Sequence, residues 1–233
     1  IYTESAGCII QFNRFGKLRP GAHGTAIKDR SSGTIIRYNE FVMNGQSNVI
    51  ALPNVQGGSG FIDLQSDYRD AHFYGNLVTI EDYSGPDSVA LWGAFDGAPL
   101  YAVGHRGTLH FYNNTIVNHH DGVALFLLPG SNYTSNATIT NPTYENVDFR
   151  NNIIYSDTEI QASVHTALRF VNSGTTDGGG DIVLGTNWIS PGWSKTAFGQ
   201  TWSGALTGTA NLIVGDASGV NDPRFINITT RDY

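Results

Sequence analysis

One short pattern returns along the whole chain and sets the repeat length of the fold. Copies read CIIQFNRF at 8–15, TIIRYNEF at 34–41, LHFYNNTI at 109–116 and VDFRNNII at 147–154. Each copy contains an aligned asparagine, and successive asparagines are 26, 37, 38, 38, 35 and 24 residues apart. The aligned residues are Asn13, Asn39, Asn76, Asn114, Asn152, Asn187 and Asn211. A coil of roughly 20–30 residues, lengthened by loop insertions, is typical of a three-sided β-solenoid.

The residues around the aligned asparagine alternate between apolar and polar, as in a strand with one buried face. The position three before it holds Ile10, Ile36, Phe73, Phe111, Phe149 and Leu184, and the position two after it holds Phe15, Phe41, Val78, Ile116, Ile154, Ile189 and Ile213. The position two before it holds Gln11, Arg37, Tyr74, Tyr112 and Arg150, which we expect to point outward. The phase changes after the asparagine, which predicts a bend between two strands. The sequence therefore predicts an all-β solenoid of about seven coils in one domain, 1–233.

The asparagine itself suits that bend. Asparagine tolerates the left-handed backbone conformation better than other residues with a side chain, glycine apart. Its amide can also hydrogen-bond to the same amide one coil away, because stacked strands lie about 4.8 Å apart. We therefore expect an asparagine ladder with a structural role and assign it no catalytic role.

Composition and charge exclude several classes of function. Charged residues make up 14% of the chain and there are 28 glycines, a turn-rich and β-rich balance. The net charge of −7, with only 13 Lys and Arg, argues against a nucleic-acid partner. No apolar run is long enough to span a membrane. The single cysteine, Cys8, excludes an intrachain disulfide. The sequence runs from Ile1 to Tyr233, and we expect it to be part of a longer chain.

Three segments carry a resemblance to a known superfamily. FYNNTIV at 111–117, FRNNIIY at 149–155 and NDPRF at 221–225 resemble the pectate-lyase-like superfamily of right-handed parallel β-helices. The resemblance covers most of the chain. It implies a right-handed parallel β-helix and an extracellular or cell-surface protein that acts on, or binds, polysaccharide. The superfamily includes lyases, glycoside hydrolases, epimerases, tailspikes and adhesins, so the fold does not select one activity.

In this superfamily the substrate often lies along the sheet that precedes the two strands flanking the asparagine bend. Five short apolar runs are candidates for that sheet: 26–30, 61–65, 90–95, 124–129 and 167–172. Aligned on their first residues, they place Lys28, Asp63, Trp92 and Arg169 in an outward column, with Arg30 two positions beyond Lys28. The register of this alignment is open to a slip of one residue.

These residues suit an acidic sugar chain. Arginine and lysine pair with carboxylates, and a tryptophan offers a flat apolar face to a sugar ring. The stretch IKDRSSGTIIRYNEF at 27–41 is similar to a motif of the alginate-lyase and chondroitinase-B branch, in which a catalytic lysine precedes Ser-Ser-Gly. Arg30 stands at that position here, and the branch's later Leu-Arg-His-Gly segment is absent after residue 41.

The resemblance implies β-elimination, which needs a cation to neutralise the uronate, a base and an acid. Lys28, Arg30 and His23 are the candidate catalytic residues, and Asp63, Trp92 and Arg169 the candidate substrate-binding residues. Ca²⁺ is the candidate cofactor, with no protein ligands assigned to it. A separate column of His72, His110 and Asp148 is either a polar outer face or a metal site.

Three functions remain open from the sequence. A polysaccharide lyase or glycoside hydrolase predicts that Lys28, Arg30 and Asp63 converge with a nearby histidine. A non-catalytic carbohydrate-binding or adhesive module predicts exposed aromatic residues without such a cluster. A structural solenoid of a larger surface assembly predicts open sheet edges that associate with another chain.

Overall fold

The structure of the chain is a computed structural model. It describes residues 1–19, 24–44, 48–53, 55–56, 70–81, 88–93, 102–103, 107–119, 124–127, 146–156, 168–172, 180–197, 204–215 and 221–224. Within these residues the chain forms β-strands, apart from one short 3₁₀ helix, η1 (Thr209–Asn211). None of the described residues form a helix with the length and apolar character that a membrane span requires.

The described strands form three parallel sheets of seven strands each and one small antiparallel pair. Sheet 1 consists of β1 (Tyr2–Thr3), β4 (Thr25–Asp29), β7 (Asn48–Leu52), β11 (Ser88–Trp92), β15 (Ala124–Leu127), β18 (Leu168–Asn172) and β21 (Trp193–Ala197). Sheet 2 consists of β2 (Ile9–Gln11), β5 (Thr34–Arg37), β9 (Asp70–Tyr74), β13 (Thr108–Tyr112), β16 (Asn146–Arg150), β19 (Ile182–Leu184) and β22 (Leu206–Thr207). Sheet 3 consists of β3 (Arg14–Phe15), β6 (Glu40–Met43), β10 (Leu77–Ile80), β14 (Thr115–Asn118), β17 (Ile153–Ser156), β20 (Asn187–Ile189) and β23 (Leu212–Val214). The antiparallel pair is β8 (Val55–Gln56) with β12 (Ala102–Val103).

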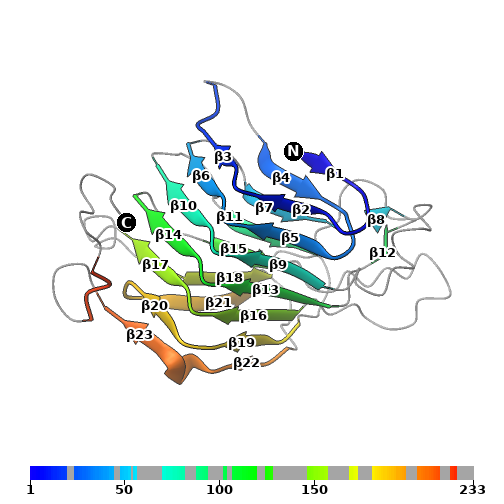
Figure 1. Cartoon of the computed structure of the whole chain (residues 1–233). Coiled ribbons are helices and arrows are strands. Elements are labelled where there is room, and N and C mark those ends of the chain that lie inside the picture. The colour runs from blue at the N-terminus through cyan, green and yellow to red at the C-terminus, as the bar shows by residue number, and fades with distance from the viewer. Residues whose placement is uncertain are drawn as a thin grey trace.

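The chain visits sheets 1, 2 and 3 in turn, so each coil adds one strand to every sheet (Figure 1). This arrangement confirms the predicted three-sided parallel β-helix. Sheets 2 and 3 are the two strands of the repeat pattern, on either side of the asparagine. Their inward columns are buried, and Phe73, Phe111 and Phe149 stack along the axis at centroid distances of 4.9 and 5.2 Å. Burial of these rings in three successive coils, and of Ile10, Ile36 and Leu184 at the same position in other coils, stabilises the solenoid.

Asparagine amides join successive coils at the corner between sheets 2 and 3. Each Nδ2 donates to the Oδ1 of the next residue in the series at 2.9–3.2 Å, from Asn13 to Asn187. The backbone N–H of the same residue donates to the same oxygen. Asn211 departs from this series, because it lies in η1 and donates instead to the carbonyl of Leu184.

The left-handed residue at this corner is not the aligned asparagine, as we had expected, but the residue before it. The φ angles there are 58° for Phe12, 54° for Tyr38, 64° for Gly75, 57° for Asn113 and 54° for Asn151. The aligned asparagine is then left in a conformation that turns its amide along the solenoid axis, toward the next coil.

The last coil also differs from the prediction. Ile213 was expected to point inward, but it pairs with Trp188 instead of Ile189 and is exposed. The turn through Gly208 and η1 shifts the register of this copy by one residue, so the inward column ends at Ile189.

Candidate functional site

Lys28 on β4 and Arg30, the residue after β4, both contact Tyr2 on β1. The Lys28 Nζ lies 5.9 Å from the centre of the Tyr2 ring and the Arg30 Cζ lies 5.6 Å from it. Arg30 also donates a hydrogen bond from Nη1 to the Tyr2 hydroxyl, and only 6% of its surface is exposed. The two candidate catalytic cations therefore both contact the Tyr2 ring, and Arg30, which was expected to face outward, is buried.

The carboxylate between these two residues, Asp29, points the other way and is buried. Its Oδ1 accepts from the Thr3 hydroxyl at 2.6 Å and from the Ser31 backbone N–H at 3.0 Å, and its Oδ2 accepts from the Thr34 hydroxyl at 2.5 Å. Burial, with the Asp29 charge as the second cause, raises the pKa of the Cys8 thiol nearby. Asp29 thus ties the corner between sheets 1 and 2, and its oxygens are occupied by the protein.

We expect Asp29→Ala to lower the free energy of unfolding by about 2 kcal/mol, because the Ser31 N–H and two hydroxyl groups lose a buried acceptor. Urea denaturation measures the change. Glu40→Ala is the matched control, since Glu40 is partly exposed, its partner Arg14 is largely exposed, and their ion pair is expected to contribute less than about 1 kcal/mol. Equal losses in the two variants would contradict a structural role for Asp29.

Of the other predicted site residues, Trp92 and Arg169 are described, and neither joins Lys28 and Arg30. His23 and Asp63 lie outside the described residues. The run 61–65 was expected to supply a strand of sheet 1, but β7 occupies the place between β4 and β11. Arg169 is half-buried on β18, four strands from β4, which corresponds to roughly 19 Å along the axis.

Trp92 was expected to face outward, and this prediction was wrong. Its side chain is 0% exposed and belongs to the core. Ala90 pairs with Ile50, which pairs with Ile27, so the inward column passes through Ala90 and Trp92 while Leu91 faces out. The predicted alignment was displaced by one residue, which moves every side chain to the opposite face of the strand.

The outer face of sheet 2 gathers aromatic and charged side chains across adjacent coils. We call it the sheet 2 face and define it by a list of nine residues: Phe12, Arg37, Tyr38, His72, Tyr74, His110, Tyr112, Asp148 and Arg150. The register places Arg37, Tyr74, Tyr112 and Arg150 in one column, and His72, His110 and Asp148 in the next.

Tyrosines and arginines form the first of these columns. The rings of Tyr74 and Tyr112 stack at 4.7 Å with 7° between their planes. Arg37 donates from Nη1 to the Tyr74 hydroxyl at 2.7 Å, which is the main cause that raises the pKa of the Arg37 guanidinium. The Arg150 Cζ lies 5.8 Å from the centre of the Tyr112 ring. An arginine thus stands at each end of a pair of stacked tyrosines.

Phe12 and Tyr38 extend the aromatic surface onto the corner with sheet 3. Their rings stack at 5.6 Å with 16° between the planes, and the residues are 73% and 48% exposed. The Tyr38 ring meets Tyr74 edge-on at 5.5 Å and lies over Gly75, where a Cβ would come within 2.6 Å of it. Gly75 is therefore needed at this position both for its positive φ and for the space that the Tyr38 ring takes.

Histidines form the second column. The rings of His72 and His110 stack at 4.6 Å with 11° between the planes. The Nδ1 of His110 lies 3.3 Å from Oδ2 of Asp148, and Arg150 Nη2 lies 2.6 Å from the same oxygen. Burial lowers the pKa of His72, the neighbouring His110 lowers it further, and Asp70 opposes both.

The histidine column was one candidate metal site, and Ca²⁺ was the candidate cofactor for sheet 1. In the part of the chain that the structure describes, no three His, Cys, Asp or Glu side chains are grouped so that they could hold a metal ion. The described residues therefore do not fit the Ca²⁺ that the resemblance implied.

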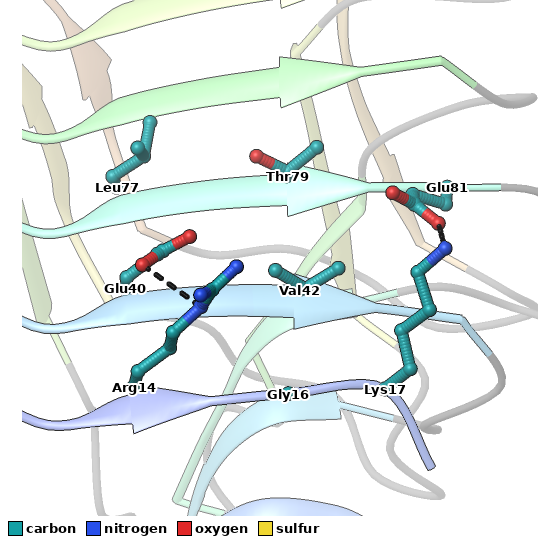
Figure 2. Close-up of a pocket in the computed structure, with 8 residues that line it drawn as sticks. All are labelled: Arg14, Gly16, Lys17, Glu40, Val42, Leu77, Thr79 and Glu81. Carbon is teal, nitrogen blue, oxygen red and sulfur yellow. Dashed lines mark ion pairs between the residues drawn. The ribbon is translucent and has the colours of Figure 1, made fainter. Parts of the chain in front are cut away.

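A hollow of about 350 Å³ lies on the outer face of sheet 3, at the N-terminal coils (Figure 2). Arg14 pairs with Glu40 at 3.1 Å and Lys17 pairs with Glu81. Figure 2 shows these two ion pairs on either side of a floor that includes Val42. Because each cation is matched by a carboxylate, the hollow has no net charge to attract an ionic ligand.

The sequence pattern contained the outward column of Arg37, Tyr74, Tyr112 and Arg150, but we had assigned it no function. Phe12 and Tyr38 were missed altogether. A signal for them was present: the position before the aligned asparagine carries Gly75, Asn113 and Asn151 in later coils, and an aromatic residue only in the first two.

The chain matches no protein-family model, no curated protein and no solved structure.

Proposed function

We propose that this chain is an extracellular or cell-surface carbohydrate-binding module that holds a polysaccharide along the sheet 2 face. The observation that carries the proposal is the exposed stack of Phe12 and Tyr38, two aromatic residues kept in a left-handed conformation at the edge of that face.

Phe12 and Tyr38 both have positive φ angles, which disfavour large side chains. A bulky residue in the left-handed region costs roughly 1–2 kcal/mol. Core burial does not compensate for this at Phe12, which is 73% exposed. Strained residues that gain little from packing are concentrated at functional sites. An exposed aromatic pair held at this cost is explained by a partner that binds to it.

The chemistry of the face suits a chain of sugars. Aromatic surface packs against the apolar faces of sugar rings, and the aromatic residues recur at the coil spacing of about 4.8 Å. Arg37 and Arg150 place guanidinium groups at the two ends of the tyrosine pair, with Arg150 also paired to Asp148. Guanidinium groups bind carboxylate and sulfate groups through paired hydrogen bonds, so an acidic polysaccharide is the ligand class that fits best.

A polysaccharide lyase that uses Lys28 and Arg30 remains a prediction from the sequence. The contacts of the described residues favour binding over catalysis, since Arg30 is nearly buried and donates to Tyr2, and Asp29 is engaged by Thr3 and Thr34.

The test is affinity electrophoresis through gels that contain polygalacturonate, alginate or chondroitin sulfate. We expect Tyr74→Ala/Tyr112→Ala to weaken binding at least tenfold, because each lost ring contact contributes about 1 kcal/mol. Trp193→Ala removes an exposed aromatic residue from sheet 1 and is the matched control. Retention of full affinity by the double variant would contradict binding on the sheet 2 face.

The same samples are followed by ultraviolet absorbance for the unsaturated product of β-elimination. Product that disappears in Lys28→Ala would establish the lyase in place of the binding module. Neither product nor binding would favour the structural solenoid, whose self-association is measured by sedimentation velocity.

A further inference from the structure

We infer that the stacked pair of His72 and His110 forms an anion subsite of the sheet 2 face, which takes up a proton when a sulfate or carboxylate group of the polymer binds there. The inference rests on the proposed function and adds to it a ligand group and a dependence on pH.

The stacking of His72 on His110 makes protonation of the second ring unfavourable once the first is protonated. The same stacking favours the binding of an anion. The two rings are parallel with centroids 4.6 Å apart, so two imidazolium charges would repel each other at close range. An anion against the rings would offset that repulsion. Binding of the anion and protonation of the pair therefore favour each other.

The described strands next to the pair, β5, β9, β13 and β16, carry several charged and titratable groups. On β5, Ile35 lies opposite His72 and Arg37 lies two residues further on. Asp70 is on β9 with His72, and Tyr112 on β13 meets His72 edge-on at 6.4 Å. On β16, Asp148 contacts both His110 and Arg150.

The charge around the histidine pair follows from these groups and from Asp181, so the count includes Asp70 and Asp181 in addition to the charged residues of the sheet 2 face. With both histidines neutral, the cations Arg37 and Arg150 are opposed by Asp70, Asp148 and, beyond β16, Asp181, which leaves a net charge of −1 (2 − 3). With both histidines protonated the net charge becomes +1 (4 − 3). An acidic polymer is therefore expected to bind weakly in mild alkali and more strongly in mild acid.

The direction of the pH effect follows from the pKa of His72, which burial and His110 lower, so the unbound protein favours the neutral form of this histidine. A bound anion raises the same pKa. Affinity then increases as pH falls through the window between the bound and the unbound pKa values. A pKa change of one unit on binding corresponds to about a tenfold change in affinity.

The experiment uses dextran sulfate, which keeps its charge at every pH tested, and uncharged dextran as the matched polymer. Isothermal titration at pH 8.0 and pH 5.5 gives the ratio of affinities. We expect the affinity for dextran sulfate to be about ten times greater at pH 5.5, and the ratio for dextran to stay near one. Titration in two buffers with different ionisation enthalpies should also show proton uptake on binding of dextran sulfate at pH 6.5.

His72→Gln/His110→Gln tests the assignment to this pair. We expect the ratio of affinities to fall to within twofold and the proton uptake to disappear. His119→Gln is the matched control, because His119 follows β14 at the end of sheet 3. This variant should keep both the pH dependence of the affinity and the proton uptake. Circular dichroism and the thermal midpoint verify that each variant is folded.

The outcomes separate the two proposals. Binding of dextran sulfate with no pH dependence, or with a dependence that the double variant retains, overturns the inference and leaves the binding module standing. Absence of binding to any polymer at either pH overturns the proposed function itself.

Discussion

Phe12→Asn/Tyr38→Asn should fold more stably than the natural chain while its affinity for polysaccharide falls about a hundredfold. Two ring contacts of roughly 1–1.5 kcal/mol each account for the loss of affinity, at about 1.4 kcal/mol per factor of ten. The gain in stability arises because asparagine tolerates positive φ, as it does at Asn113 and Asn151 in the same turn. Relief of roughly 1 kcal/mol per site exceeds the loss of the half-exposed ring stack, so a net gain of about 1 kcal/mol is expected.

Opposite changes in stability and binding are what distinguish a functional aromatic pair from a structural one. If Phe12 and Tyr38 served only to pack the corner, both quantities would fall together. Urea denaturation and affinity electrophoresis on the same preparation provide the two values. A rise in stability with unchanged binding would contradict the proposed role of the pair.

Asn113→Tyr is the matched control for the backbone argument. Asn113 occupies the same turn with φ of 57° and is exposed, so an aromatic ring there carries the conformational cost without an adjacent aromatic pair in the same turn. The free energy of unfolding should fall by about 1 kcal/mol.

The sequence predicted sheet 2 because its strands bury one face only. Sheet 3 followed from the apolar column two residues after the aligned asparagine, although β10, β14 and β17 are buried on both faces. Around each aligned asparagine the apolar and polar residues alternate, so inward residues such as Phe73 and Ile116 could be separated from outward residues such as Tyr74. Alternation of this kind determines the register as well as the presence of a strand.

Four of the five predicted runs overlap strands of sheet 1, namely β4, β11, β15 and β18. β7 was missed and the register of β11 was misread because that alternation is missing there. On β7, Val49, Ile50, Ala51 and Leu52 are all buried, so the strand appears in the sequence as a continuous apolar run. Such runs are typical of parallel strands that are covered on both faces, and they contain no period-two signal to fix the register. Trp92 was assigned to the wrong face for this reason.

The columns of the sheet 2 face could be predicted from the sequence, but the contacts between its columns and the corner could not. The pairing of His110 with both His72 and Asp148 follows from the repeat alone, since these residues share one column. The position of Tyr38 over Gly75 does not follow from it. That contact depends on the left-handed backbone at Tyr38, which the sequence analysis had assigned to the following asparagine.

Asn114→Ala should lower the free energy of unfolding by about 3–5 kcal/mol, the largest loss of stability that we expect from a single substitution. The Asn114 side chain is buried and donates to the Phe73 carbonyl and to Asn152 Oδ1, while its own Oδ1 accepts from the backbone N–H of Asn76. Alanine leaves the Asn76 N–H and the Phe73 carbonyl buried without these partners. Each orphaned group costs roughly 1–3 kcal/mol, and the small cavity adds to this.

Asn13→Ala removes the same amide at the exposed end of the series and is the matched control. Asn13 donates to Gln11 and to Asn39 Oδ1, but water can replace these bonds at the first coil, so we expect a loss below about 1 kcal/mol. Urea denaturation of both variants gives the comparison. Similar losses at Asn13 and Asn114 would mean that the amides contribute through the turn conformation that each residue adopts. A large loss confined to Asn114 would mean that the cost comes from burial, because in a solenoid each interior corner has no access to water and must satisfy its polar groups from the adjacent coils.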